Sequence, residues 1–141
     1  FIILGIAVPH YSELDSTFGR VNARSYLIED LKRAQAQSVT EGCRGVFEID
    51  LNGEGYEFGC DYLDYDASDP PSPDEVAFRR NLPRGITISA EYPIIFNSRG
   101  QSVDIYGIIQ NNSIALSEDH AGDSNDFASG TLLGTGVFSY D

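Results

Sequence analysis

Two hydrophobic periodicities divide the chain. Up to about residue 41, apolar positions recur at steps of three, four or seven, as at Leu14, Phe18, Val21, Ile28, Leu31 and Ala34, and this spacing is typical of one face of a helix. Gly42 follows the last periodic residues, where a left-handed helix cap is expected. After Gly42 the period changes to two. The pattern therefore predicts a helix over residues 1–41 and an antiparallel β domain over residues 42–141.

The predicted helix begins with an uninterrupted apolar run from Phe1 to Val8, which ends at Pro9. Eight residues are too few to cross a bilayer, which needs about 20 apolar residues. A helix over residues 1–41 would be about 60 Å long, more than the β domain could cover. The apolar end would then protrude and need a membrane or another protein. The alternative is an apolar strand followed by a core helix of ordinary length that begins after Pro9.

The pattern of residues 42–141 predicts short strands joined by turns. Alternating runs at Val46–Asp50 and Tyr56–Phe58 flank a glycine-containing loop, which predicts a hairpin. Further strands are expected at residues 85–90, 94–97, 102–109, 113–116 and 136–140. Residues 61–74, with three prolines, and the polar residues 119–129 are predicted to be loops. Because no helical pattern separates the strands, the predicted fold class is α+β, a long N-terminal helix packed on antiparallel sheet.

The two cysteines bracket the predicted hairpin. Cys43 and Cys60 lie nearly opposite each other about the turn, so their Cα atoms fall within the separation that a disulfide requires. A disulfide would indicate an oxidising compartment. The alternative is two buried free thiols in a cytoplasmic protein.

Net charge becomes informative once the chain is divided. The 141 residues carry 9 basic and 22 acidic side chains, a formal charge of −13. Residues 1–44 hold five of each sign, so the whole excess lies in the second segment. Apolar residues make up 41% of the chain, which excludes an acidic disordered protein. Nucleic acid is not an expected partner, because binding it without sequence preference needs basic residues that neutralise phosphates.

Particular residues resemble a known family. The run from Ile3 to Tyr11 resembles the second half of the N-terminal methylation helix of type IV pilin-like proteins. The run from Leu27 to Ala36 resembles the pattern of Leu, two polar residues, Leu, Arg and Ala in the GspH/FimT family of minor pseudopilins and minor pilins. Phe96–Gly100 resembles that family's mid-domain turn, and Gly134–Val137 its final strand. The family's peptidase site, methylated phenylalanine and nearby glutamate have no counterpart here, so we expect the natural amino terminus to lie upstream of Phe1.

The resemblance implies a pilin-like fold and a non-enzymatic role. It implies a minor pseudopilin of a bacterial type II secretion system, anchored by one helix in the inner membrane with its β domain in the periplasm. The expected partners are other pseudopilin or pilin subunits. The residues expected in the core of the filament are Phe1, Ile2, Ile3, Leu4, Ile6 and Val8. Two alternatives stay open: a minor type IV pilin that primes pilus assembly, and a secreted calcium-dependent binding module.

The sequence offers few candidates for chemistry. His10 and His120 alone could act as bases at neutral pH without a large pKa shift, and neither stands in a pattern that predicts catalysis. Calcium binds clustered carboxylates and carbonyls. Asp50, Asn52, Glu54 and Asp61 match the spacing of a calcium loop, although the same residues also favour the hairpin turn. If calcium is bound, the expected ligands are Asp61, Asp64, Asp66 and Asp69; no other cofactor is expected.

Overall fold

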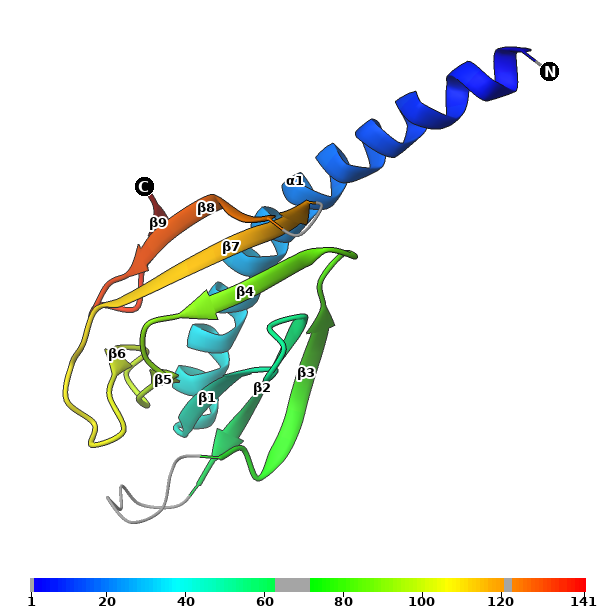
Figure 1. The fold of residues 1–141 in the computed structure, drawn as a ribbon. Coiled ribbons are helices and arrows are strands. Elements are labelled where there is room, and N and C mark those ends of the chain that lie inside the picture. Colours follow the sequence, from blue (N-terminus) through cyan, green and yellow to red (C-terminus); the bar gives the residue numbers. More distant parts are fainter. Residues whose placement is uncertain (1, 63–71, 121–122) are drawn as a thin grey trace.

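The computed structural model describes the backbone of residues 2–62, 72–120 and 123–141, and the side chains of residues 18–62, 72–119 and 125–141. A helix, α1 (Ile2–Glu41), precedes two antiparallel sheets and lies behind both of them in Figure 1, with its N-terminal half projecting beyond them. The first sheet has the order β3 (Glu75–Asn81), β2 (Gly55–Asp61), β1 (Arg44–Ile49), β5 (Ile94–Phe96), β6 (Ser102–Val103). The second has the order β4 (Ile86–Ala90), β7 (Asn112–His120), β8 (Asp123–Leu132), β9 (Phe138–Tyr140). This is the predicted α+β fold class.

The C-terminus of α1 is capped as predicted. Gly42 has a φ of 62°, a left-handed conformation that costs glycine little because it has no Cβ. Its N–H donates to the carbonyl of Val39 at 3.3 Å, and the N–H of Cys43 donates to that of Ser38 at 3.1 Å. These are the two bonds of a Schellman motif. The motif ends the helix and turns the chain directly into β1.

The helix buries only part of the stripe that its spacing predicted, namely Leu31 and Ala34. Ala23, Leu27, Leu31 and Ala34 are buried against the sheets, at steps of three and four residues. Phe18 and Val21, which we predicted to share the buried stripe, are 62% and 55% exposed. The prediction fails there because another side of this turn faces the domain. A Cβ on Gly19 would lie 3.6 Å from Ile86 of β4, and Ala23 is fully buried.

The core forms where α1 meets the two sheets. The sheets contribute the aromatic side chains of Phe47, Tyr56, Phe58 and Phe96, together with aliphatic side chains such as Leu132. Gly45 lets the helix approach closely, because a Cβ at this position would overlap the hydroxyl of Ser38 on α1 and the ring of Phe58. The second half of α1 and both sheets therefore share one hydrophobic core.

Several strands differ from the predicted ones. The hairpin of β1 and β2 is present, with Phe47 opposite Phe58. β3 was not predicted; it is an edge strand whose residues are mostly exposed, so it lacks a hydrophobic alternation. The strand expected at residues 102–109 is reduced to β6 and a turn. The loop expected at residues 119–129 is wrong, because β7 and β8 pair as far as His120 and Asp123.

A buried carboxylate joins α1 to two strands of the first sheet. Asp30, 2% exposed, accepts a hydrogen bond from the hydroxyl of Tyr56 on β2 at 2.7 Å. It also accepts bonds from Nε and Nη2 of Arg80 on β3 at 2.9 and 3.2 Å. The Arg80 guanidinium stacks on Tyr26, 4.1 Å from the ring centroid. A charge-assisted network of this kind fixes the position of the helix on the sheet.

A disulfide ties the end of α1 to β2. Cys43 and Cys60 are bonded, with their Cα atoms 5.7 Å apart. Cys60 faces Gly45 in the ladder, so the bond runs diagonally from the residue after the helix cap. It crosslinks the chain at the point where helix becomes strand.

Replacing Asp30 with alanine is expected to destabilise the domain by about 3 kcal/mol, because it leaves the Tyr56 hydroxyl and the Arg80 guanidinium without their shared acceptor. Urea unfolding followed by circular dichroism would measure this loss. Glu29→Ala is the matched control, since Glu29 is exposed on the same helix. Equal stability of the two variants would contradict the proposed importance of the network.

Burial, followed by the hydrogen bond to Asp30, raises the pKa of Tyr56 well above its ordinary value of 10.0. Above about pH 10 the unfolded chain therefore loses a proton that the folded protein keeps, and stability falls as pH rises, by about 1.4 kcal/mol per pH unit. We expect Tyr56→Phe to have a shallower loss of stability than the parent between pH 10 and 11, measured by urea unfolding. Parallel curves would contradict the assignment. Tyrosines at other positions contribute equally to both proteins.

Removing the disulfide by the double change Cys43→Ser and Cys60→Ser is expected to cost about 3 kcal/mol, since a crosslink across 17 positions restricts the unfolded chain. Thermal unfolding with and without a reductant would test it. The parent's melting temperature should fall on reduction, and that of the double variant should not move. A parent insensitive to complete reduction would refute the expectation.

Candidate functional site

The most prominent feature is the projecting part of α1. The helix is continuous from Ile2 through Pro9 into the domain, which rules out a strand before Pro9. The backbone positions of Ile2, Ile3, Leu4, Ile6 and Val8, predicted to pack in a filament core, therefore lie on a helix that extends away from the sheets (Figure 1). Phe1 lies outside the described residues. Among the described residues, no helix combines the length and the apolar character needed to cross a membrane.

Where α1 leaves the domain it exposes apolar side chains. Phe18 and Val21 are mostly exposed, and residues three apart lie on the same face of a helix. The end of β7 contacts the same turn of α1, because Nε of Arg20 is 3.1 Å from Oε2 of Glu118.

The predicted calcium ligands are only partly described. Asp61 ends β2, where it is buried and bonded by Nη2 of Arg44 at 2.6 Å; the N–H of Ser72 also donates to it at 3.2 Å. It was expected in a loop. Asp64, Asp66 and Asp69 lie outside the described residues. Calcium binding at this end of the domain stays a prediction. The Asp61 carboxylate is already paired with the guanidinium of Arg44.

The hairpin separates the ends of the other calcium-loop match. Asp50 lies at the turn, where Nη1 and Nη2 of Arg79 donate to its two oxygens at 2.9 and 2.5 Å. These hydrogen bonds hold the pKa of Asp50 below its ordinary range. Asp61 stands at the far end of β2, about 20 Å away at 3.4 Å per residue. The structure does not bring Asp50 and Asp61 together.

The carboxylate of Glu41 lies against the disulfide, with one oxygen 2.9 Å from Sγ of Cys60. The hydroxyl of Tyr62 donates to the same oxygen at 3.1 Å. Within the described part of the chain, Glu41, Cys43 and Cys60 form a cluster of residue types that can bind a metal. Both sulfurs are in the disulfide, so the cluster offers no thiolate. The side chains of His10 and His120 lie outside the described set.

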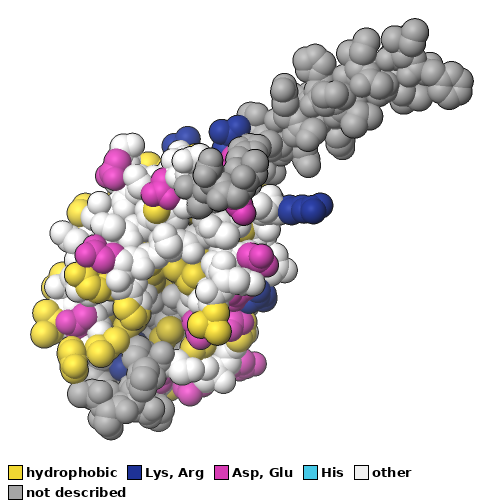
Figure 2. Space-filling view, viewed as in Figure 1, with side chains coloured by type: hydrophobic (Ala, Val, Ile, Leu, Met, Phe, Trp, Pro, Cys, Tyr) yellow, Lys and Arg dark blue, Asp and Glu magenta, His cyan; other side chains and the backbone are white. Residues whose placement is uncertain are grey.

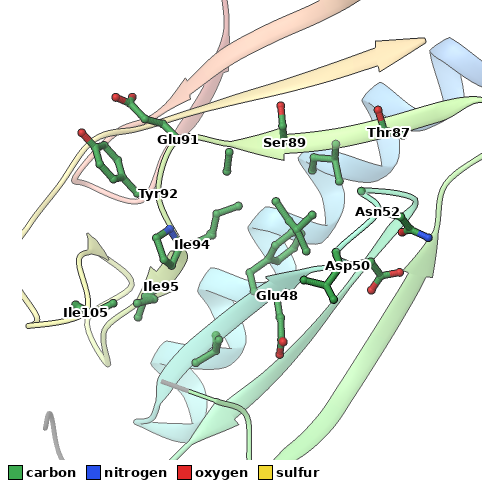
Figure 3. A pocket seen from close by; sticks show the side chains of 18 residues that line it. Glu48, Asp50, Asn52, Thr87, Ser89, Glu91, Tyr92, Ile94, Ile95 and Ile105 are labelled. Carbon is green, nitrogen blue, oxygen red and sulfur yellow. The ribbon is translucent and has the colours of Figure 1, made fainter. Parts of the chain in front are cut away.

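A cavity of about 680 Å³ opens between the two sheets, in the size range of ligand sites. Figure 3 shows Thr87 and Ser89 of β4 on one side and Glu48 and Asp50 from β1 and its turn on the other. Tyr92, Ile94, Ile95 and Ile105 close a third side. Hydrophobic side chains are exposed in the middle of this face of the domain, with acidic side chains around them (Figure 2). We call the cavity between the two sheets the intersheet cavity.

Two contacts keep the cavity open and bounded. The side chain of Asn112 bonds both backbone groups of Tyr92, accepting from its N–H at 3.1 Å and donating to its carbonyl at 2.8 Å. Tyr92 is the residue that would continue the pairing of β1 with β5, opposite Ile49. At the other end the N–H of Ile88 donates to the carbonyl of Gly53 at 2.8 Å. These contacts connect the two sheets at the two ends of the cavity, and the cavity lies between the contacts.

No sequence pattern predicted the intersheet cavity. Its lining comes from β1, β4, β5 and the turn at residues 51–53, segments that are distant in sequence. The alternation at residues 85–90 indicated a strand, but not that one edge of this strand is unpaired. Only the arrangement of the sheets places Glu48 and Glu91 at the mouth of one cavity.

No protein-family model and no curated protein matches this sequence. Solved structures match it well in three dimensions. The type IV minor pilin FimU of Pseudomonas aeruginosa superposes with a TM-score of 0.63 at 13% identity, covering 85% of this chain and 86% of FimU. The minor pseudopilin EpsH from the type II secretion system of Vibrio cholerae gives a TM-score of 0.53 at 13% identity, covering 87% and 95%. The chain has the pilin fold of these two proteins, which confirms the fold implied by the resemblance of its residues.

Proposed function

We propose that this protein is a minor pseudopilin, a structural subunit of a type II secretion pseudopilus that acts by assembly and not by catalysis. The observation that carries the proposal is a helix that extends well beyond its own domain and has an apolar sequence where it projects. A projecting apolar helix needs a membrane or another protein to cover it, and in an assembled filament the helices of neighbouring subunits would cover it. The likeness to EpsH and FimU supports the same role.

The exposed side chains at the domain boundary support this packing. Phe18 and Val21 face solvent in the single chain, and burying apolar surface yields about 25 cal/mol per Å². The formal charge of residues 1–44 is zero, so like helices can approach without net repulsion. The filament core would therefore extend from the apolar residues near Phe1 to about residue 20.

The disulfide supports a periplasmic location for the sheet domain. Disulfides persist in the bacterial periplasm and are rare in the cytoplasm. We propose that α1 belongs to the inner-membrane anchor before assembly, with the sheets on the periplasmic side. The helix then leaves the membrane for the filament.

A minor type IV pilin is the second candidate, because the type IV minor pilin FimU has the same fold. Both candidates use the projecting helix in the same way and differ in the assembly that the subunit joins. Deleting the gene in its own bacterium would separate them. Loss of enzyme secretion with normal pili supports the pseudopilin, whereas loss of pili with normal secretion would replace it with the pilin.

Phe18→Glu tests the packing of the helix. Because Phe18 is exposed, we expect unchanged thermal stability of the isolated chain but a loss of at least about tenfold in copurification with the other subunits, since a charge would be buried in the assembled core. Membrane extracts and immunoprecipitation from the native bacterium would measure it. The matched control is Thr40→Glu, an exposed position near the opposite end of α1.

The control separates packing from charge in general. Normal assembly of Thr40→Glu with failure of Phe18→Glu supports the proposal. Assembly of Phe18→Glu at the parent's level would exclude this part of α1 from the filament core.

A further inference from the structure

The intersheet cavity has the features of a peptide-binding site, and none of them depends on the filament role. Its floor is apolar, it lies between strands that are not paired with each other, and acidic side chains stand at its mouth. We propose that it binds a short extended segment of a partner protein, about four residues long, in which apolar and basic side chains alternate.

The edge of β4 supplies the first unpaired backbone groups. Gly85 and Glu91 bond to β7, since the N–H of Asp119 donates to the carbonyl of Gly85 and the N–H of Glu91 to that of Ser113, both at 2.9 Å. Hydrogen-bonded pairs alternate along an antiparallel ladder, so Ile88 and Ala90 turn their backbone groups to the other edge of β4. The N–H of Ile88 already bonds Gly53. The carbonyl of Ile88 and both groups of Ala90 are thus directed to the cavity side.

The edge of β1 supplies the second set. The N–H of Asp50 donates to the carbonyl of Gly55 across the hairpin at 3.0 Å, so by the same alternation Ile49 directs its N–H and carbonyl away from β2. β5 would pair with them, but its ladder stops at Ile94 opposite Phe47 because Asn112 holds Tyr92. Unpaired strand edges of this kind are templates for an added strand.

The side chains around the cavity select what this strand carries. In a strand, successive side chains point to opposite faces, so alternate residues of a bound peptide would enter the apolar floor and the others would face outward. Glu48 of β1 and Glu91 after β4 line the cavity from two sides, and both are exposed. The net charge of −13 adds a long-range preference for a basic segment. Alternating apolar and basic residues satisfy both requirements.

The ends of the cavity limit the length of the segment. The bond between Ile88 and Gly53 closes one end, and the turn through Tyr92 into β5 closes the other. A long strand could not pass through, so the ligand is a loop tip or a chain end that enters from solvent.

A synthetic pentapeptide that alternates lysine and valine, blocked at both ends, is the probe. We expect it to bind the full 141-residue chain and to shift the backbone amide resonances of Ile49 and Ala90 most strongly in ¹⁵N-correlated spectra. The same peptide with N-methylated backbone amides should bind at least about tenfold more weakly, because it cannot donate to the strand edges. A glutamate–valine peptide should not bind measurably.

Two variants test the site itself. Ala90→Pro removes an N–H that the register with β7 directs away from that strand, and proline is tolerated at an edge of this kind. It should weaken binding at least about tenfold without changing the β7 ladder. Glu48→Lys should weaken binding about fivefold through charge repulsion. Glu29→Lys is the matched control, since it makes the same charge change on an exposed face of α1.

Binding that survives both N-methylation and Ala90→Pro would overturn the strand-pairing proposal. Equal losses with Glu48→Lys and Glu29→Lys would reduce the effect to net charge and also overturn the site. Shifts centred away from Ile49 and Ala90, or self-association of the chain through this face, would assign the cavity another occupant. None of these results bears on copurification of the Phe18→Glu variant, so this proposal and the filament role fail independently.

Discussion

The buried carboxylate of Asp30 fixes the helix on the first sheet, and much of the remaining architecture depends on that position. It accepts hydrogen bonds from Tyr56 on β2 and Arg80 on β3, so it joins three elements that are far apart in sequence. Because a buried charge is costly without its partners, the helix cannot slide or rotate without losing all three bonds. The disulfide and the glycine cap then hold the end of the same helix at the start of β1.

A fixed helix explains how one small domain can hold two separate sheets. Both sheets bury side chains against α1, so they need not pair continuously with each other. A hydrogen bond between Ile88 and Gly53 connects the two sheets. They separate near Tyr92, whose backbone is hydrogen-bonded to the side chain of Asn112. The intersheet cavity is a consequence of this packing, and the projecting half of α1 is the other surface that the domain leaves uncovered. The projecting half of α1 is proposed to pack against neighbouring helices, and the intersheet cavity is proposed to bind a short strand.

Local patterns predicted the elements whose signals are strong over a few residues. Gly42 marked the end of the helix, and the run around Asn52 and Gly53 marked the hairpin, because turn and cap conformations depend on neighbouring residues. β3 was not predicted because an exposed edge strand needs no hydrophobic alternation. The end of β7 and the start of β8 were not predicted as strands, because their composition is polar and acidic and therefore indicated a loop. These residues pair with each other beyond the core.

The sequence by itself determined the helix, the hairpin with its flanking cysteines, the α+β class and the likeness to pilin-like proteins. Each depends on periodicity, spacing or local backbone preference, which a linear pattern records. Only the tertiary structure decided which helix face is buried, that Asp30 and Asp61 are partners of arginines, and that β1 and β4 leave unpaired edges around one cavity. Those features arise between residues far apart in the chain, where contacts depend on how the two sheets pack on α1.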